Sequence, residues 1–366
     1  MANHSEAAGL LTRIYEVYGI PAFGIKPHGT VWKLAAPDGN YGLKHLKLST
    51  EQIHDLAGIF ANLTKAGFPH LSRTLTTKSG AVWFTAAGRN YILAPWYDGE
   101  NPDFRNPEHL TQVARLFGRL HSFSAQLGPV PNSIRRNGLL KYQERTDFLG
   151  RVLEGLRQAP PPDLRFSQWR IQRINRIDRN ILKSGPHFLA QAQFMAQELI
   201  ANGAGYQLND LLPVGFCHND PAPRNLILRR GEIVMIDFEH SGWDHFICEV
   251  TTLLNRSLEA NQWNGDIFEL IVGAYEMERS LTPAESRLLP YLLLFPQRFW
   301  RICRQRYHED LQWTEKRFAR RLHQIMDQEP YRAKFLGKWF PQEIVCCPDN
   351  ARQIADRICA FHKGEN

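Results

Sequence analysis

Three oxygen-bearing side chains lie close together in the second half of this 366-residue chain. Asp220 precedes Asn225 by five residues, and Asp237 follows two short apolar runs that read as strands. If these runs pair as an antiparallel hairpin centred on Gly231, Asn225 and Asp237 end side by side at its open end. Carboxylate and amide oxygens are ligands that Mg²⁺ accepts in proteins. The spacing therefore predicts a magnesium site with a further carboxylate in the preceding loop.

The order of these residues is also that of a phosphotransferase site. His218, Asp220, Asn225 and then Asp237 follow the H-x-D-x-x-x-x-N pattern and the later metal-binding Asp of kinase-like enzymes. Phosphoryl transfer passes through a mostly charged transition state, so such a site must place cations, orient a hydroxyl and accept its proton. Asp220 is the candidate base. The alternatives are a plain loop acid at Asp220 and two polar residues that cap a hairpin.

The first hundred residues are expected to form strands and one helix. β-rich runs alternate with turn residues, and Asp38-Gly39 between two of them is a strong hairpin signal. Ser49 and Gln52 resemble a capping box, which predicts a helix that ends near Gly67. The strands are expected over residues 29–36, 41–48, 81–85 and 91–95.

Helices are expected to dominate after about residue 100, because apolar residues recur there at helical spacing. One β-rich island over residues 215–238 interrupts them. The sequence predicts an α+β fold with a small antiparallel β lobe over residues 1–98 and a large, mainly helical lobe over residues 99–366, with a ligand cleft between them. The expected helices cover residues 140–156, 164–202, 249–280, 283–327 and 349–362.

Composition narrows the class of protein. Hydrophobic residues make up 43% and charged residues 22%, which excludes a mostly disordered chain. The chain has no apolar run long enough to span a membrane and no secretory signal. Its six cysteines show no zinc-binding spacing, so we expect free thiols in a reducing compartment and a cytoplasmic protein.

The residues quoted above resemble a known superfamily. Residues 216–239 are similar to the Brenner-type motif of aminoglycoside phosphotransferases and choline kinases. Across nearly the whole chain the sequence resembles the CotS family of spore coat proteins, which have a kinase-like fold. The resemblance implies a protein-kinase-like, two-lobed architecture. The stretches that support the closer match are residues 41–44, 91–99, 116–121 and 295–300.

The resemblance also implies roles and cofactors. Asp220 would be the catalytic base, Asn225 and Asp237 would bind Mg²⁺, and Lys44 would hold the α- and β-phosphates of ATP. The turn that contains Gly29 would cover the phosphates, and backbone groups near Ala94 and Trp96 would meet the adenine. Structural support is implied for His218, Glu239 and Asp244.

Two features depart from the family pattern. Relatives carry a glutamate on the helix after the lysine, whereas this helix has only Glu51 and Asp55 near its start. Glu249 also stands where an aspartate is usual. A hairpin turning on Asp38-Gly39 would further set Lys33 opposite Lys44, an unfavourable pair, although a different register is equally possible.

Two functions remain open. The first is Mg-ATP-dependent transfer of a phosphoryl group to an unidentified hydroxyl acceptor, linked to the spore coat. The second is a weakly active or inactive kinase-like structural or binding protein of the coat, with other coat proteins as partners. The net charge of +7 fits polyanionic partners. The basic stretches over residues 164–183 and 298–321 fit solvated helix faces, docking to an acidic partner, or binding of an anionic substrate. Nucleic-acid binding is disfavoured because no motif accompanies them.

Overall fold

The computed structural model describes residues 4–128, 131–158, 164, 175–199, 212–309 and 313–345. These residues form two compact units. The first contains residues up to 136, 214–249 and 274–279, and the second contains residues 137–213, 250–273 and 280 onward. A small antiparallel sheet and a larger helical part confirm the predicted α+β class.

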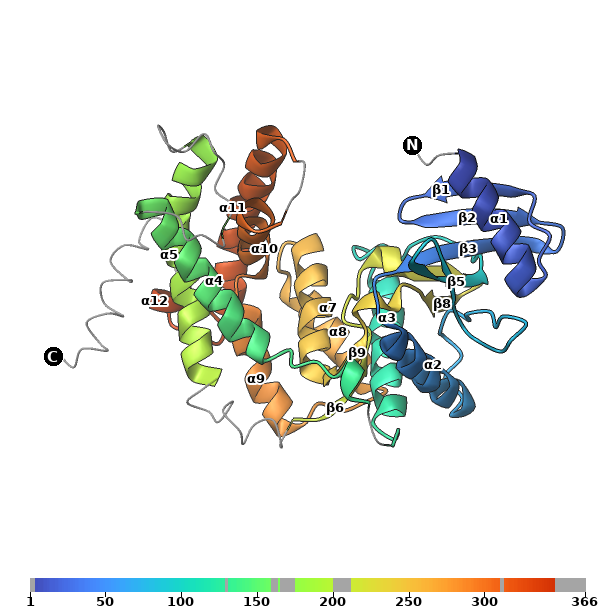
Figure 1. Cartoon of the computed structure of the whole chain (residues 1–366). Helices are drawn as coiled ribbons and strands as arrows, with labels where there is room; N and C mark the ends of the chain where they lie inside the picture. Colours follow the sequence, from blue (N-terminus) through green and yellow to red (C-terminus); the bar gives the residue numbers. More distant parts are fainter. Residues whose placement is uncertain are drawn as a thin grey trace. The chain divides into compact units, whose positions relative to one another are not determined.

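A five-stranded antiparallel sheet opens the first unit (Figure 1). Helix α1 (His4–Tyr18), which the sequence analysis missed, packs against this sheet. Leu10 and Ile14 of α1 join Leu34, Leu43 and Leu93 in one buried cluster. The strands, in spatial order, are β1 (Gly24–His28), β2 (Val31–Ala36), β3 (Gly39–Leu46), β5 (Arg89–Pro95) and β4 (Phe84–Ala86).

The β2–β3 hairpin corrects one expected register. Ala36 pairs with Gly39, so the turn is Pro37-Asp38 and not Asp38-Gly39. Lys33 consequently lies opposite Gly42, while Lys44 lies opposite Val31, and the two lysines do not face each other across these strands. The Lys33–Lys44 pair is therefore not formed, whereas Lys33 lies opposite Lys26 across β1 and β2.

Helix α2 (Thr50–Lys65) forms as predicted. Ser49 and Gln52 make both bonds of the capping box, and Gly67 with a φ of 96° follows the end of the helix. The buried face of α2 consists of Ile53, Leu56, Ile59 and Leu63.

The rest of the first unit carries the motif residues. Helix α3 (Pro107–Ser124) packs against β6 (Val214–Cys217). Strand β6 pairs with β9 (Gly242–His245), and β7 (Leu226–Arg229) pairs with β8 (Glu232–Met235). Helices α7 (Phe246–Ala260) and α8 (Gly265–Glu276) contribute residues to both units.

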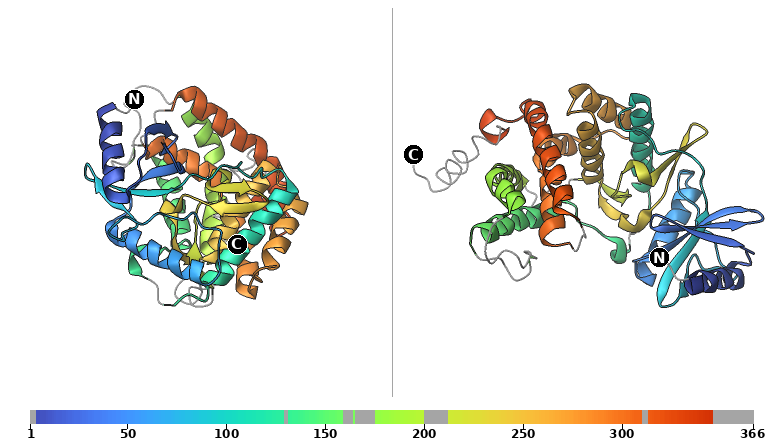
Figure 2. Two further views of the ribbon diagram at one scale, coloured as in Figure 1. Left: turned by 90° about the vertical axis from the view of Figure 1, so that its right-hand side faces the viewer. Right: turned by 90° about the horizontal axis from the view of Figure 1, so that it is seen from above.

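The second unit is helical within the described residues (Figure 2). The expected helix over 140–156 is confirmed, and the described part of the one expected over 164–202 begins at Arg176. The single helix expected over 249–280 is two helices, α7 and α8, and the one expected over 283–327 is three, α9 to α11. The helix expected over 349–362 lies outside the described residues. The remaining helices are α4 (Leu140–Arg157), α5 (Arg176–Leu199), α9 (Pro283–Leu294), α10 (Gln297–Tyr307), α11 (Glu315–Leu336) and α12 (Gln342–Val345).

Two expectations from composition are tested here. Cys217, Cys248 and Cys303 are buried thiols that are not joined in disulfides, as predicted, while the other three cysteines lie outside the described residues. Within the part of the chain that the structure describes, none of the helices has both the length and the hydropathy of a membrane span.

Candidate active site

The β7–β8 hairpin forms as predicted, but one residue out of the expected register. Leu226 pairs with Met235 and Arg229 with Glu232, so the turn is Arg230-Gly231, and its centre is not Gly231. Asn225 therefore lies opposite Ile236, whose N–H donates to the Asn225 carbonyl at 2.9 Å. The turn residues have φ values of 51° and 80°, which suit a tight hairpin.

The loop before this hairpin joins Asp220 to Asn225. The Asn225 amide nitrogen donates to the Asp220 carboxylate at 2.8 Å and to its carbonyl at 3.0 Å. Arg224 Nη2 donates to the same carboxylate oxygen, Oδ2, at 2.6 Å. Asp220 and Asn225 are both buried, whereas the Arg224 side chain is 63% exposed. The candidate base is thus held by the candidate metal ligand and by an accessible guanidinium group.

Lys44 takes its acidic partners from the segment after the hairpin. Its ammonium group forms an ion pair with Asp237 and lies 3.4 Å from Glu239 Oε2. Helix α2 provides no such acid. It instead sets Phe60 against Phe238, with ring centroids 4.7 Å apart, and against Phe216, 5.8 Å apart. An aromatic cluster stands where the sequence analysis looked for a glutamate.

The remaining nucleotide-binding candidates lie on the five-stranded sheet. Gly29, with a φ of 61°, is in the turn between β1 and β2, as expected. Ala94 pairs with Gly42, and the Trp96 N–H donates to the Asn40 carbonyl at 2.9 Å. These three residues are therefore positioned by backbone pairing.

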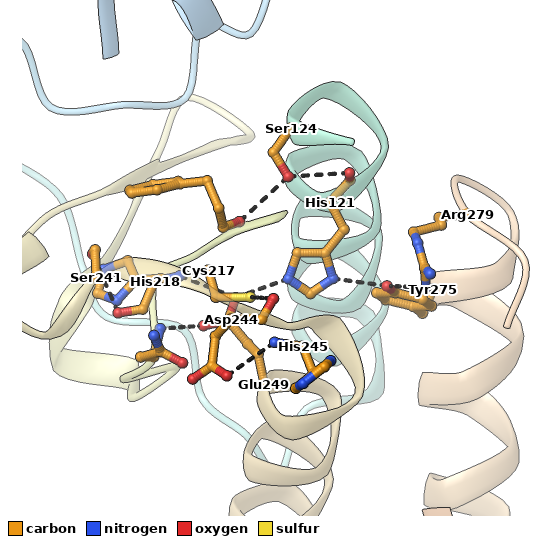
Figure 3. A network of polar contacts seen from close by, with 12 residues as sticks. His121, Ser124, Cys217, His218, Ser241, Asp244, His245, Glu249, Tyr275 and Arg279 are labelled. Carbon is orange, nitrogen blue, oxygen red and sulfur yellow. Dashed lines mark hydrogen bonds and ion pairs between the residues drawn. The ribbon is translucent and has the colours of Figure 1, made fainter. Parts of the chain in front are cut away.

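A buried acid anchors the loop that carries Asp220 (Figure 3). Glu249 accepts the backbone N–H groups of His218, at 3.1 Å, and of Asn219. Its Oε2 lies 2.9 Å from Nε2 of His121, and Nδ1 of His121 lies 2.7 Å from the Tyr275 hydroxyl. The sequence analysis noted Glu249 but missed this network. The sequence signal that could have revealed it is His121, a histidine on the apolar face of α3.

Burial controls the protonation of this network. It raises the pKa of Glu249 to about 7, against the opposing effects of His218 and of the two backbone N–H groups. Burial likewise raises the pKa of the Cys217 thiol well above its ordinary value. The neighbouring thiol is therefore neutral, and Glu249 titrates near neutral pH.

The family resemblance implies structural roles for His218, Glu239 and Asp244. Each of them makes different contacts. His218 is buried, and its Nε2 lies 2.8 Å from the Ile236 carbonyl, next to Asp237. Asp244 is buried in β9 and accepts the His245 N–H at 2.9 Å. Glu239 is the second acid beside Lys44.

The donor atoms suit a magnesium ion. Both hydrogen bonds of the Asn225 side chain use its nitrogen, so its oxygen is the atom suited to ligate a cation. The Asp237 carboxylate is 32% exposed and can reach solvent. Oxygen donors that leave room for water or phosphate are what Mg²⁺ requires. Asn225 and Asp237 are thus the residues that would hold it.

A known protein is similar to this chain over most of its length. The chain is 22% identical over 317 residues to Spore coat protein S of Bacillus subtilis (strain 168), an alignment covering 84% of this chain and 86% of that protein.

Solved structures share its fold. An aminoglycoside phosphotransferase from Alicyclobacillus acidocaldarius superposes with a TM-score of 0.73 and 19% identity, covering 98% of this chain and 97% of that one. An amicoumacin kinase, solved with AMP-PNP and Ca²⁺, gives a TM-score of 0.60 and 15% identity, covering 93% of this chain and 97% of that one. Residues 28–289 match the phosphotransferase enzyme family, and the chain belongs to this family.

Proposed function

We propose that the protein transfers the γ-phosphoryl group of Mg-ATP to a hydroxyl acceptor. The observation that supports this most is the pairing of Asp220 with Asn225 in one loop and of Asp237 with Lys44 beyond the next hairpin. A base, two oxygen donors and an ammonium group are the parts that phosphoryl transfer needs.

In this proposal Asp220 accepts the proton of the acceptor hydroxyl. Its hydrogen bonds to Asn225 and Arg224 keep the carboxylate oriented. Lys44 holds the α- and β-phosphates as a compact charge. Asn225 and Asp237 would hold the magnesium ion, which would supply positive charge to the phosphates. Residues 1–98 would form the nucleotide lobe, and residues 99–366 would carry the catalytic loop and the acceptor site.

The nucleotide would lie against the five-stranded sheet. The turn at Gly29 would cover the phosphates, and the backbone at Ala94 and Trp96 would meet the adenine. The two-residue turn at Gly29 and the fold shared with an AMP-PNP-bound kinase support this arrangement.

A kinase-like structural or binding protein of the spore coat is the second candidate. The similarity to Spore coat protein S favours it, as does the missing acid on α2. In this candidate the protein is made in the cytoplasm, joins the coat with other coat proteins, and keeps nucleotide binding without transfer or loses both.

Turnover assays separate the two candidates. Purified protein is incubated with ATP and Mg²⁺ and scanned over amino alcohols, sugars and coat peptides, with Asp220→Asn alongside. We expect phosphorylation of one acceptor class, and a drop of about 10²–10⁴-fold in the variant. Equal turnover in the variant would remove Asp220 from the mechanism.

Calorimetry with ATP and Mg²⁺ tests the site itself. Asp237→Ala should abolish magnesium-dependent binding, whereas Glu232→Ala, an exposed acid of the same hairpin, should leave it intact. Tight binding without transfer to any acceptor would favour the coat-protein alternative. If the wild type does not bind ATP, both phosphoryl transfer and nucleotide binding without transfer are ruled out.

A further inference from the structure

A groove in the helical unit joins the two basic stretches of the sequence. Helices α5 and α11 line an open cavity of about 700 Å³. Each helix contributes three side chains at i, i+4 and i+7 spacing, which places them along one face. These rim residues are Arg176, Asn180 and Lys183 on α5, and Lys316, Arg320 and His323 on α11.

The charges on the rims are not balanced locally. Arg176, Lys183, Lys316 and Arg320 are exposed, and none of them makes an ion pair with another described residue. The nearby carboxylate of Glu315 is engaged by Arg306 at 3.0 Å. No carboxylate is among the described residues that line the groove.

Further guanidinium groups add to this positive charge. Partial burial and the charges of Arg298, Arg317 and Arg320 lower the pKa of Arg321, next to the groove on α11. Like charges held this close are unfavourable unless an anion offsets them. The groove is therefore suited to a ligand with several negative charges.

The floor of the groove is apolar. Ile177 and Leu322 are buried, Met326 is partly buried, and Ala319 and Pro330 complete the lining. No Phe, Tyr or Trp is among the described lining residues, so bases of a nucleic acid would lack the large aromatic platforms on which single strands stack. An apolar floor between cationic rims matches a helix with one apolar face and acidic flanks.

We propose that the groove between α5 and α11 binds an acidic, amphipathic helical segment of a partner protein. Apolar side chains of the segment contact Ile177, Leu322 and Met326, and its carboxylates pair with the cations on both rims. Seven residues of helix span about 10 Å, so each rim matches about two turns of the bound segment. The proposal does not depend on phosphoryl transfer.

A peptide-binding assay tests it. The probe is a fluorescein-labelled 15-residue peptide with leucine at helical spacing flanked by glutamate, compared with a scrambled peptide of the same composition. Fluorescence polarisation at two salt concentrations should show saturable binding that is weaker at high salt. The scrambled peptide should bind about tenfold more weakly, because it has no apolar face.

Two double variants, each replacing two basic residues by glutamate, show whether the peptide binds in the groove. Arg176→Glu/Arg320→Glu should weaken binding about tenfold, in proportion to two lost charge pairs. Arg179→Glu/Lys334→Glu changes exposed residues of the same helices outside the groove and should have little effect. Circular dichroism confirms that both variants are folded. Equal weakening by both variants, equal binding of the scrambled peptide, tighter binding of a 12-mer oligodeoxythymidylate, or no saturable binding would each overturn the proposal.

Discussion

Replacing Glu249 by glutamine should change how stability depends on pH. The wild-type carboxyl group keeps its proton in the folded protein up to about pH 7, whereas its ordinary pKa is 4.5. Between these values the unfolded chain ionises and the folded chain does not. The free energy of unfolding therefore falls as pH rises through this window and levels off above about pH 7. Glutamine has no proton to lose, so this loss is absent in the variant.

The magnitude follows from the same contacts. A difference of about 2.5 between the two pKa values corresponds to about 3 kcal/mol. The glutamine nitrogen cannot accept the His218 N–H that Oε2 now accepts at 3.1 Å, and an unpaired buried N–H costs about 1–3 kcal/mol. The variant should therefore be less stable at pH 4.5. Its deficit should shrink or reverse by pH 8.

Urea unfolding of both proteins from pH 4.5 to pH 8 measures this difference. The two stability curves should approach each other by about 3 kcal/mol, while Glu232→Gln, a change at an exposed acid, should follow the wild type. Curves that stay parallel within about 0.5 kcal/mol would refute the assignment of the titration to Glu249.

Three further substitutions test other parts of the site. Lys44→Met should weaken ATP binding about tenfold or more in calorimetry, since a charged contact is lost; unchanged affinity would contradict its assignment. Gly215→Ala should lower the unfolding free energy by about 1–3 kcal/mol, because a Cβ would meet Phe246 at 2.3 Å. Phe60→Ala should cost about 1–3 kcal/mol by removing two aromatic contacts. Urea melts measure both, and wild-type stability would argue against the packing described.

Local signals in the sequence predicted local structure well. The capping box at Ser49 and the helix that became α4 depend on a few adjacent residues, and both are present. Helix α1 was missed although Leu10, Ile14 and Val17 recur at helical spacing, and these residues pack against the sheet. Packing of this face, more than helix propensity, stabilises so short a helix.

The strand registers and the acidic partner of Lys44 were harder to predict, because both depend on contacts between distant parts of the chain. The β2–β3 turn lies one residue earlier than expected, which shifts the strand pairing by two residues. The β7–β8 pairing shifts by one residue, and a one-residue slip changes which face a side chain shares with its partner. The partner of Lys44 comes from a segment 193 residues away. No spacing rule links such distant residues, so only the folded chain could reveal the pair with Asp237.

The segment after β8, residues 237–239, has two structural roles. Asp237 and Glu239 pair with Lys44, while Phe238 between them packs against Phe60 of α2. The left-handed backbone at Asp237, with a φ of 65°, turns the chain at this point. An acid on α2 would make the ion pair of the lysine depend on the position of that helix. Here the lysine is tied directly to the candidate metal ligand, and α2 is held by a less directional aromatic contact. A small displacement of α2 would therefore leave the Lys44–Asp237 pair intact.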